Sequence, residues 1–182
     1  MAGNPSVIDK LLEDHQDVKK TFAKFDTADR AEWWDIFVSL TNDLVRHEVA
    51  EEEIVYPEVR KALPDGDQLA DARISEQAEA EELLSTMEKK GKDDKDFPAN
   101  LAKLREAVLA HAGKEEVTVF TPLASALSQD RLEQLGGRYE KAKAAAPTHP
   151  HPNAPDTPPG NMVLGPVAAM ADRFRDAVRK AS

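Results

Sequence analysis

The sequence predicts an all-α protein, built as an antiparallel up-down-up-down four-helix bundle. Aromatic residues make up only 5% of the 182-residue chain, whereas β-strands are enriched in aromatic and β-branched residues. Long segments rich in Ala, Leu, Glu and Lys place apolar residues three and four positions apart, which is the spacing of a core-facing helix. Short loops separate these segments, so consecutive helices are expected to lie antiparallel.

The first helix is expected to run from Ser6 to about Phe25. The Ser6 hydroxyl can cap the free amides of the first turn, with Asp9 three residues further on. His15 falls inside the apolar stripe of this helix, which is formed by Ile8, Leu11, Val18 and Phe22. An inward-facing histidine is therefore predicted, and a hydrogen-bonded core histidine is the alternative to a metal ligand.

Three further helices complete the predicted bundle. The second is expected over residues 31–62, with a bend around Pro57 because proline removes a backbone hydrogen bond and clashes with the preceding turn. The third is expected over residues 67–90. The fourth is expected over residues 99–127, with a second bend at Pro122.

The chain is expected to divide into three parts. Residues 1–128 form the bundle, and residues 129–146 add a helix in which Gly136 and Gly137 are a weak point. Residues 147–182 form a proline-rich strap and a short amphipathic helix packed on the bundle, with a partner-binding tail as the alternative.

Composition excludes several classes of partner and site. The net charge is -10, from 24 basic and 34 acidic residues, so neither nucleic acid nor an anionic membrane is expected as the partner. There is no cysteine, which excludes disulfides, thiolate metal sites and iron–sulfur clusters. The N-terminal residues lack the basic flank and apolar run of a secretory signal, and no apolar segment is long enough to span a bilayer, so a cytoplasmic protein is expected.

Two related motifs lie in the second and fourth predicted helices. The first contains His47, Glu51, Tyr56 and Pro57, and the second contains His111, Glu115, Phe120 and Pro122. Each motif places an imidazole and a carboxylate four residues apart, on the face that carries the apolar stripe. A carboxylate that faces a core is costly unless it is paired or binds a metal, so the two matching pairs predict one metal site.

Together with Asp14 and His15, these motifs resemble the hemerythrin family, specifically its bacterial HHE cation-binding domains, over about residues 6–128. The resemblance implies a four-helix bundle around a non-haem di-iron centre with an oxo or hydroxo bridge. It implies terminal ligand roles for His15, His47 and His111, and bridging roles for Glu51 and Glu115. Iron is the implied cofactor, with zinc or manganese as substitutes, because nitrogen and oxygen donors without thiolate suit these metals.

The third helix departs from the family pattern. Glu76-Gln77 stands where the family has a Glu-His pair, and a neutral glutamine is a poor iron ligand. Glu81, one turn after Gln77 on the same face, is one candidate replacement. Glu52 and Glu116 follow the motif glutamates and point away from the site, so they are expected at the surface or as hydrogen-bond partners of the ligands.

Two other candidate ligands lie farther along the chain. Tyr56 could bind through its phenolate oxygen if the bend at Pro57 turns it inward; on an ideal helix it lies opposite His47, which favours a packed aromatic residue. His151, or its neighbour His149, could reach one end of the bundle from the strap, although histidines in proline-rich stretches are more often solvated.

The function that the resemblance implies is binding or processing of a small ligand: dioxygen, hydrogen peroxide or nitric oxide. The protein would then be a sensor, a carrier or a peroxide-removing (catalase-like) protein. The altered ligand set favours peroxide decomposition, nitric oxide chemistry or sensing over reversible oxygen carriage. Two alternatives stay open: a metal-free helical adaptor whose polar residues form a buried hydrogen-bonded network, and a mononuclear zinc or iron site.

Overall fold

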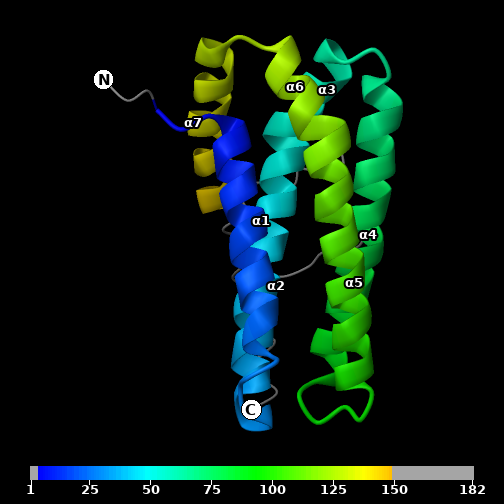
Figure 1. The fold of residues 1–182 in the computed structure, drawn as a ribbon. Helices are drawn as coiled ribbons and strands as arrows, with labels where there is room; N and C mark the ends of the chain where they lie inside the picture. Colours follow the sequence, from blue (N-terminus) through cyan, green and yellow to red (C-terminus); the bar gives the residue numbers. More distant parts are fainter. Residues whose placement is uncertain (1–3, 149–182) are drawn as a thin grey trace.

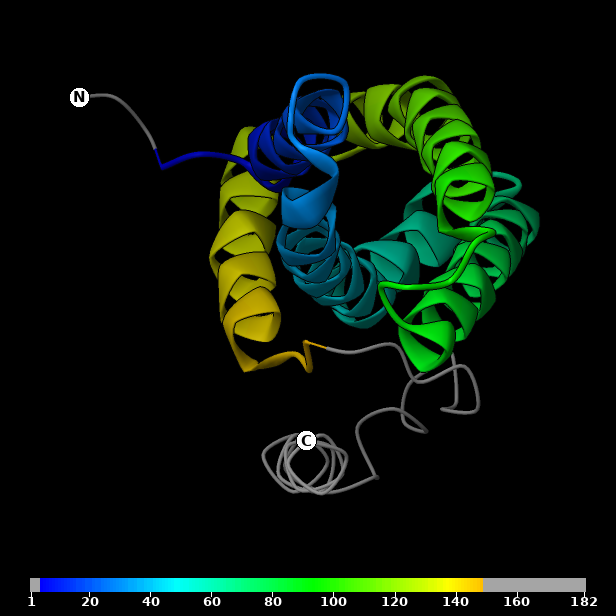
Figure 2. The same cartoon turned by 90° about the horizontal axis from the view of Figure 1, so that it is seen from below.

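The computed structural model of the protein describes residues 4–148, and within these residues the chain is helical with no strands (Figure 1). Four long helices run alternately down and up the bundle: α1 (Val7–Lys24), α2 (Trp33–Ala50), α4 (Gly66–Lys90) and α5 (Phe97–Glu115). A short 3-10 turn, η1 (Arg30–Glu32), leads into α2. Seen along its axis, the bundle is a ring in which α1 and α2 lie opposite α4 and α5 (Figure 2). The predicted all-α bundle is confirmed.

The first helix begins where the sequence predicts. The Ser6 hydroxyl accepts a hydrogen bond from the Asp9 amide at 3.2 Å, and the Asp9 carboxylate accepts one from the Ser6 amide at 2.9 Å. This reciprocal pair satisfies two amides that the start of a helix otherwise leaves free.

The two prolines that follow the motifs change the helices in a way that was not predicted. A wide π-helical turn interrupts each helix: η2 (Glu51–Val55) is followed by α3 (Tyr56–Ala62), and η3 (Glu116–Phe120) by α6 (Thr121–Ala126). In η2 the Tyr56 amide bonds to the carbonyl of Glu51, five residues back. The irregularity thus begins at the motif glutamate, before Pro57, because a proline has no amide to donate and its ring crowds the carbonyl four residues back.

The wide turn rotates the residues that follow it. One extra residue per turn shifts them by about 100° relative to a continuous α-helix. Tyr56 therefore turns toward the side of the bundle that His47 faces instead of lying opposite it. Tyr56 is 1% exposed and Phe120, its counterpart in the second motif, is 2% exposed.

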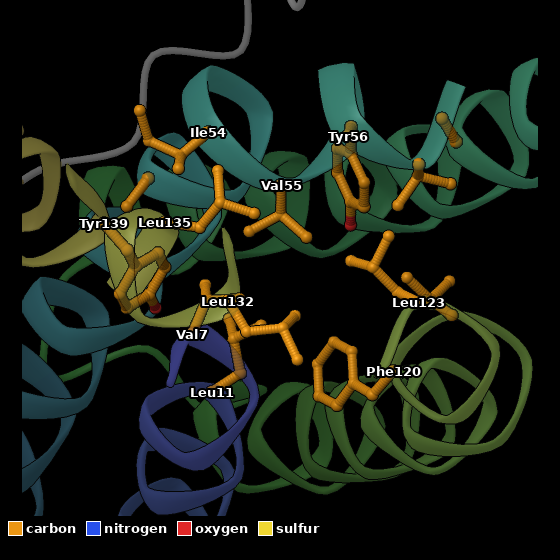
Figure 3. Packing of buried hydrophobic residues seen from close by; sticks show 14 of the residues in the cluster. Val7, Leu11, Ile54, Val55, Tyr56, Phe120, Leu123, Leu132, Leu135 and Tyr139 are labelled. Carbon is orange, nitrogen blue, oxygen red and sulfur yellow. The ribbon is translucent and has the colours of Figure 1, made fainter. Parts of the chain in front are cut away.

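The apolar core consists of two clusters separated by polar residues. The upper cluster (Figure 3) contains Val7, Leu11, Ile54, Tyr56, Phe120, Leu123, Leu132, Leu135 and Tyr139, among others. The lower cluster contains Phe22, Phe37, Leu40, Leu44, Leu84, Phe97 and Leu104, among others. Along the long helices the residues between the two clusters are polar and buried, and we call them the polar layer: His15, His47, Glu51, Gln77 and Glu115.

The additional helix is confirmed as α7 (Gln129–Ala145), which packs against α1 and α2 outside the ring (Figure 2). It is continuous through Gly136 and Gly137, so the two glycines do not interrupt the helix. The two glycines differ in their surroundings. A Cβ atom on Gly136 would lie 2.6 Å from the Pro5 carbonyl oxygen, whereas a Cβ atom on Gly137 would meet no atom within 4 Å. Gly136 thus allows the start of α1 to approach α7 closely.

Gly136→Ala is expected to destabilise the protein by about 2 kcal/mol, because the new methyl group would overlap backbone atoms of Pro5 and Ser6. Gly137→Ala is the matched control and is expected to stabilise by about 1 kcal/mol, since alanine is the better helix former. Denaturant unfolding of both variants measures the two effects. Equal responses would show that this close approach does not limit stability.

None of the helices between residues 4 and 148 combines the length and apolar character that crossing a bilayer requires. The predicted C-terminal amphipathic helix and nearly all of the proline-rich strap, with His149 and His151, lie outside the described residues.

Candidate metal centre

Four of the predicted ligand residues meet in the polar layer. His15 comes from α1, His47 from α2, Glu51 from the start of η2 and Glu115 from the end of α5. Each offers one nitrogen or oxygen atom, and these four atoms lie within 4.8 Å of one another. The two histidines are at most 5% exposed and the two glutamates are fully buried. Three helices thus bring the donors together in the interior of the bundle.

The fifth predicted ligand, His111, adjoins this group. Its Nε2 lies 3.4 Å from Glu115 Oε2, and His15 Nε2 lies 3.6 Å from the same oxygen. His47 Nε2 lies 3.4 Å from Glu51 Oε2. All three imidazoles therefore turn Nε2 toward the two carboxylates, and the four-residue spacing in each motif brings its pair together as predicted.

The opposite nitrogen of each imidazole contacts an outer group. His15 Nδ1 lies 3.0 Å from Glu116 Oε1, and His111 Nδ1 lies 3.1 Å from Glu76 Oε2. His47 Nδ1 lies 3.3 Å from Asp14 Oδ2 and 2.8 Å from the Tyr139 hydroxyl oxygen. The outer partners of the three imidazoles are thus Glu116, Glu76, Asp14 and Tyr139. A proton held on Nδ1 leaves the Nε2 lone pair free, which is the arrangement of carboxylate–histidine–metal triads.

Basic side chains hold the outer carboxylates in their charged form. Burial alone would raise the pKa of Glu76, but Lys114 and His111 lower it below the ordinary glutamate value. His15 and Lys19 lower the pKa of Glu116 against the same burial effect. Asp14 is half-buried, which alone would raise its pKa, yet its contacts with His47, Lys143 and Tyr139 hold that pKa well below the usual range. The lysines that contact these outer carboxylates are Lys19, Lys114 and Lys143.

The two inner carboxylates differ in their protonation. Burial and the neighbouring charge of Glu115 raise the pKa of Glu51 well above its usual range. Burial alone would raise the pKa of Glu115 as well, but His111 and His15 beside it lower that pKa below the ordinary value. In the metal-free protein a proton is therefore held more readily by Glu51 than by Glu115.

Three buried atoms of the site lack a hydrogen-bond partner: Oε1 of Glu51, Oε2 of Glu115 and Nε2 of His111. Buried polar atoms are nearly always paired, so unpaired ones require an explanation. These are electron-pair donors of the kinds that bind iron, manganese and zinc. The donor set therefore fits a bound metal cation.

Two hydrogen bonds from neighbouring side chains hold the inner carboxylates. Gln77 Nε2 donates to Glu51 Oε2 at 2.7 Å, so the residue that replaces the family's histidine contacts the site through its amide. The Tyr56 hydroxyl donates to Glu115 Oε1 at 2.8 Å. Burial and the nearby glutamates raise the pKa of Tyr56 well above its usual range, so it stays a protonated donor.

The structure places the three candidate replacements for the missing histidine differently. Tyr56 reaches the site because the η2 turn rotates it inward. Glu81 is half-buried on α4 and does not belong to the group of four converging donors found in residues 4–148. His151 lies outside the described residues.

A small cavity adjoins the centre. Its volume is about 20 Å³, enough for one water-sized molecule. Its walls are mainly apolar and include His15, Val18, Leu44, His47, Gln77, Ala80, Val108 and His111. On another side of the site the Phe120 ring stacks on His15, with 5.2 Å between ring centroids. The site can therefore admit only a very small molecule.

Sequence reasoning gave no role to three of the outer residues. Asp14 and Glu76 directly precede His15 and Gln77 in the sequence, and this adjacency could have indicated that they lie near the site. Glu116 was expected at the surface or as a partner of a ligand, and it contacts His15. Tyr139 is 92 residues from His47, on a helix outside the motifs, and the sequence carries no signal for it.

Comparison with known proteins agrees with this geometry. The family model described as the hemerythrin HHE cation binding domain matches residues 6–123. A hemerythrin-like protein from Schizosaccharomyces pombe is 33% identical over 172 residues, which cover 94% of this chain and 82% of that protein. A protein from Nostoc sp. named DNA nickase is 28% identical over 140 residues, covering 76% of this chain and 39% of the nickase. No solved structure matches significantly. The chain belongs to the hemerythrin HHE cation-binding family.

Proposed function

We propose that the protein is a non-haem di-iron protein that binds or processes a small ligand: dioxygen, hydrogen peroxide or nitric oxide. One observation carries this proposal. The Nε2 atoms of three histidines face two buried carboxylates, and three of these five residues have a buried atom without a hydrogen-bond partner. A purely structural hydrogen-bonded network is expected to pair most of its buried polar atoms.

The two motifs suggest how the donors would be divided. Each motif supplies one histidine and one glutamate, and His15 adds an imidazole from α1. We infer that His15, His47 and His111 would hold the irons as terminal ligands, together with the carboxylates of Glu51 and Glu115. When bound, the iron pair would supply redox-active positions that coordinate the small ligand.

The protein's own residues would orient the donors and restrict access. Tyr56 fixes the orientation of Glu115, and Gln77 fixes that of Glu51. Glu116 and Glu76 would keep the proton of His15 and His111 on Nδ1, so that Nε2 stays available to the metal. The cavity of about 20 Å³ beside the centre is small, which favours ligands of a few atoms over larger substrates.

Expression of the full chain in iron-supplemented medium tests the proposal. We expect about two iron atoms per chain and absorption bands of an oxo-bridged ferric pair, since the site offers carboxylates positioned to bridge. Metal analysis and the absorption spectrum are the measurements. Less than roughly half an equivalent of any transition metal would support the metal-free adaptor instead. About one equivalent without oxo-to-ferric bands would support the mononuclear site.

A further inference from the structure

Helix α7 reaches the metal centre from outside the four-helix ring. Its residue Tyr139 is fully buried in the upper cluster (Figure 3), beyond the segment 6–123 that the family model matches. The Tyr139 ring lies edge-on to the His47 ring, at 6.3 Å between centroids. Its hydroxyl oxygen is 2.8 Å from His47 Nδ1 and 2.7 Å from Asp14 Oδ2.

The direction of these hydrogen bonds follows from the number of protons. A phenol carries one proton, and the carboxylate of Asp14 can only accept. Tyr139 therefore donates to Asp14 and accepts from the Nδ1–H of His47. These two consecutive hydrogen bonds fix His47 in the tautomer that carries its proton on Nδ1 and a free lone pair on Nε2. Nε2 is the nitrogen that faces Glu51, at 3.4 Å from Oε2.

His47 differs in this respect from the other two histidines of the site. His15 and His111 contact carboxylates directly, at 3.0 and 3.1 Å. For His47 the nearest carboxylate, Asp14, is farther away at 3.3 Å, and the phenol oxygen at 2.8 Å is the closer partner. The shorter contact has the larger share in orienting the ring.

Helix α7 also fixes the other side of Asp14. Lys143, one turn after Tyr139, donates to Asp14 Oδ1. The helix is itself held close to α1 at Gly136 and by the buried side chains of Leu132 and Leu135. The position of the hydroxyl is therefore determined by packing, as a residue that orients a ligand requires.

We propose that Tyr139 is a positioning residue of the metal centre, which orients His47 and holds its tautomer for metal binding. This inference rests on the proposed metal centre. It makes α7 part of the site, although α7 supplies no ligand.

Tyr139→Phe in the full chain tests the inference, because phenylalanine keeps the buried ring and removes only the hydroxyl. We expect the iron-loaded variant to lose iron to a competing chelator about 10-fold faster than the wild type, with shifted ferric absorption bands. In the metal-free protein, ¹⁵N NMR is expected to show His47 as the Nδ1–H tautomer in the wild type and as a tautomer mixture in the variant.

Leu123→Ala is the matched control. It removes buried apolar volume from α6 in the same cluster and lowers stability more than Tyr139→Phe, but it leaves α7 and the hydroxyl in place. We expect its iron release and His47 tautomer to match the wild type. Wild-type values in Tyr139→Phe, or equal losses in both variants, would overturn the inference. If the wild type takes up no iron, the proposed function fails, while the His47 tautomer still decides whether Tyr139 orients this ring.

Discussion

Glu51→Gln and Glu115→Gln are each expected to abolish iron loading, yet to have different effects on the metal-free protein. Glutamine keeps the size of the side chain and removes the carboxylate that a cation requires. Without metal, burial and the charge of Glu115 raise the pKa of Glu51, which favours its neutral form, so Glu51→Gln is expected to change the stability by no more than about 1 kcal/mol. Against the effect of burial, His111 and His15 lower the pKa of Glu115, which favours its charged form, so its replacement by a neutral amide is expected to cost more, about 2 kcal/mol.

Denaturant unfolding of the metal-free variants and metal analysis of the iron-loaded variants measure the two effects separately. Equal losses of stability would contradict the assignment of the proton to Glu51. Normal iron content in either variant would show that its carboxylate is not a ligand. The control is Glu133→Gln on α7, at a half-exposed glutamate whose carboxylate accepts a hydrogen bond from Gln129 outside the site, and it is expected to change neither quantity.

Phe37→Ala is expected to destabilise the protein by about 3 to 5 kcal/mol, the range observed when a buried phenylalanine is truncated. Phe37 is fully buried in the lower cluster, where its ring meets that of Phe97 edge-on at 5.2 Å and that of Trp34 at 5.4 Å. The lower cluster does not include the donors of the polar layer. Iron content of the folded variant should therefore equal that of the wild type.

Denaturant unfolding gives the stability change, and metal analysis at a temperature well below the melting transition gives the iron content. Leu12→Ala, which truncates a side chain 37% exposed on α1, is the control and should cost less than about 1 kcal/mol. Loss of iron from folded Phe37→Ala would mean that the lower cluster shapes the centre.

The sequence was sufficient to predict the bundle and the inner part of the site because both depend on local periodicity. A histidine and a glutamate four residues apart share a helix face whatever the tertiary structure. The apolar stripes around His15, His47 and His111 indicated which face is buried. The capping pair of Ser6 and Asp9 was likewise visible in four consecutive residues.

The remaining features depend on geometry that local patterns do not carry. Pro57 indicated a bend, but not that the chain would insert a residue ahead of it and thereby rotate Tyr56 onto Glu115. Gly136 looked like a helix breaker, and only its contact with Pro5 shows why a side chain is excluded there. Tyr139 joins the site through the packing of α7, which no motif encodes.

The polar layer between the two apolar clusters has a consequence for how the protein opens. Few apolar contacts cross this layer, so without a cation the upper and lower halves can exchange their amide hydrogens through separate partial openings. A cation held by residues of α1, α2 and α5 would tie three helices together at the boundary between the halves. Ion binding would then couple the two halves into a single cooperative unit, and the amide protection of both would rise to the same global value.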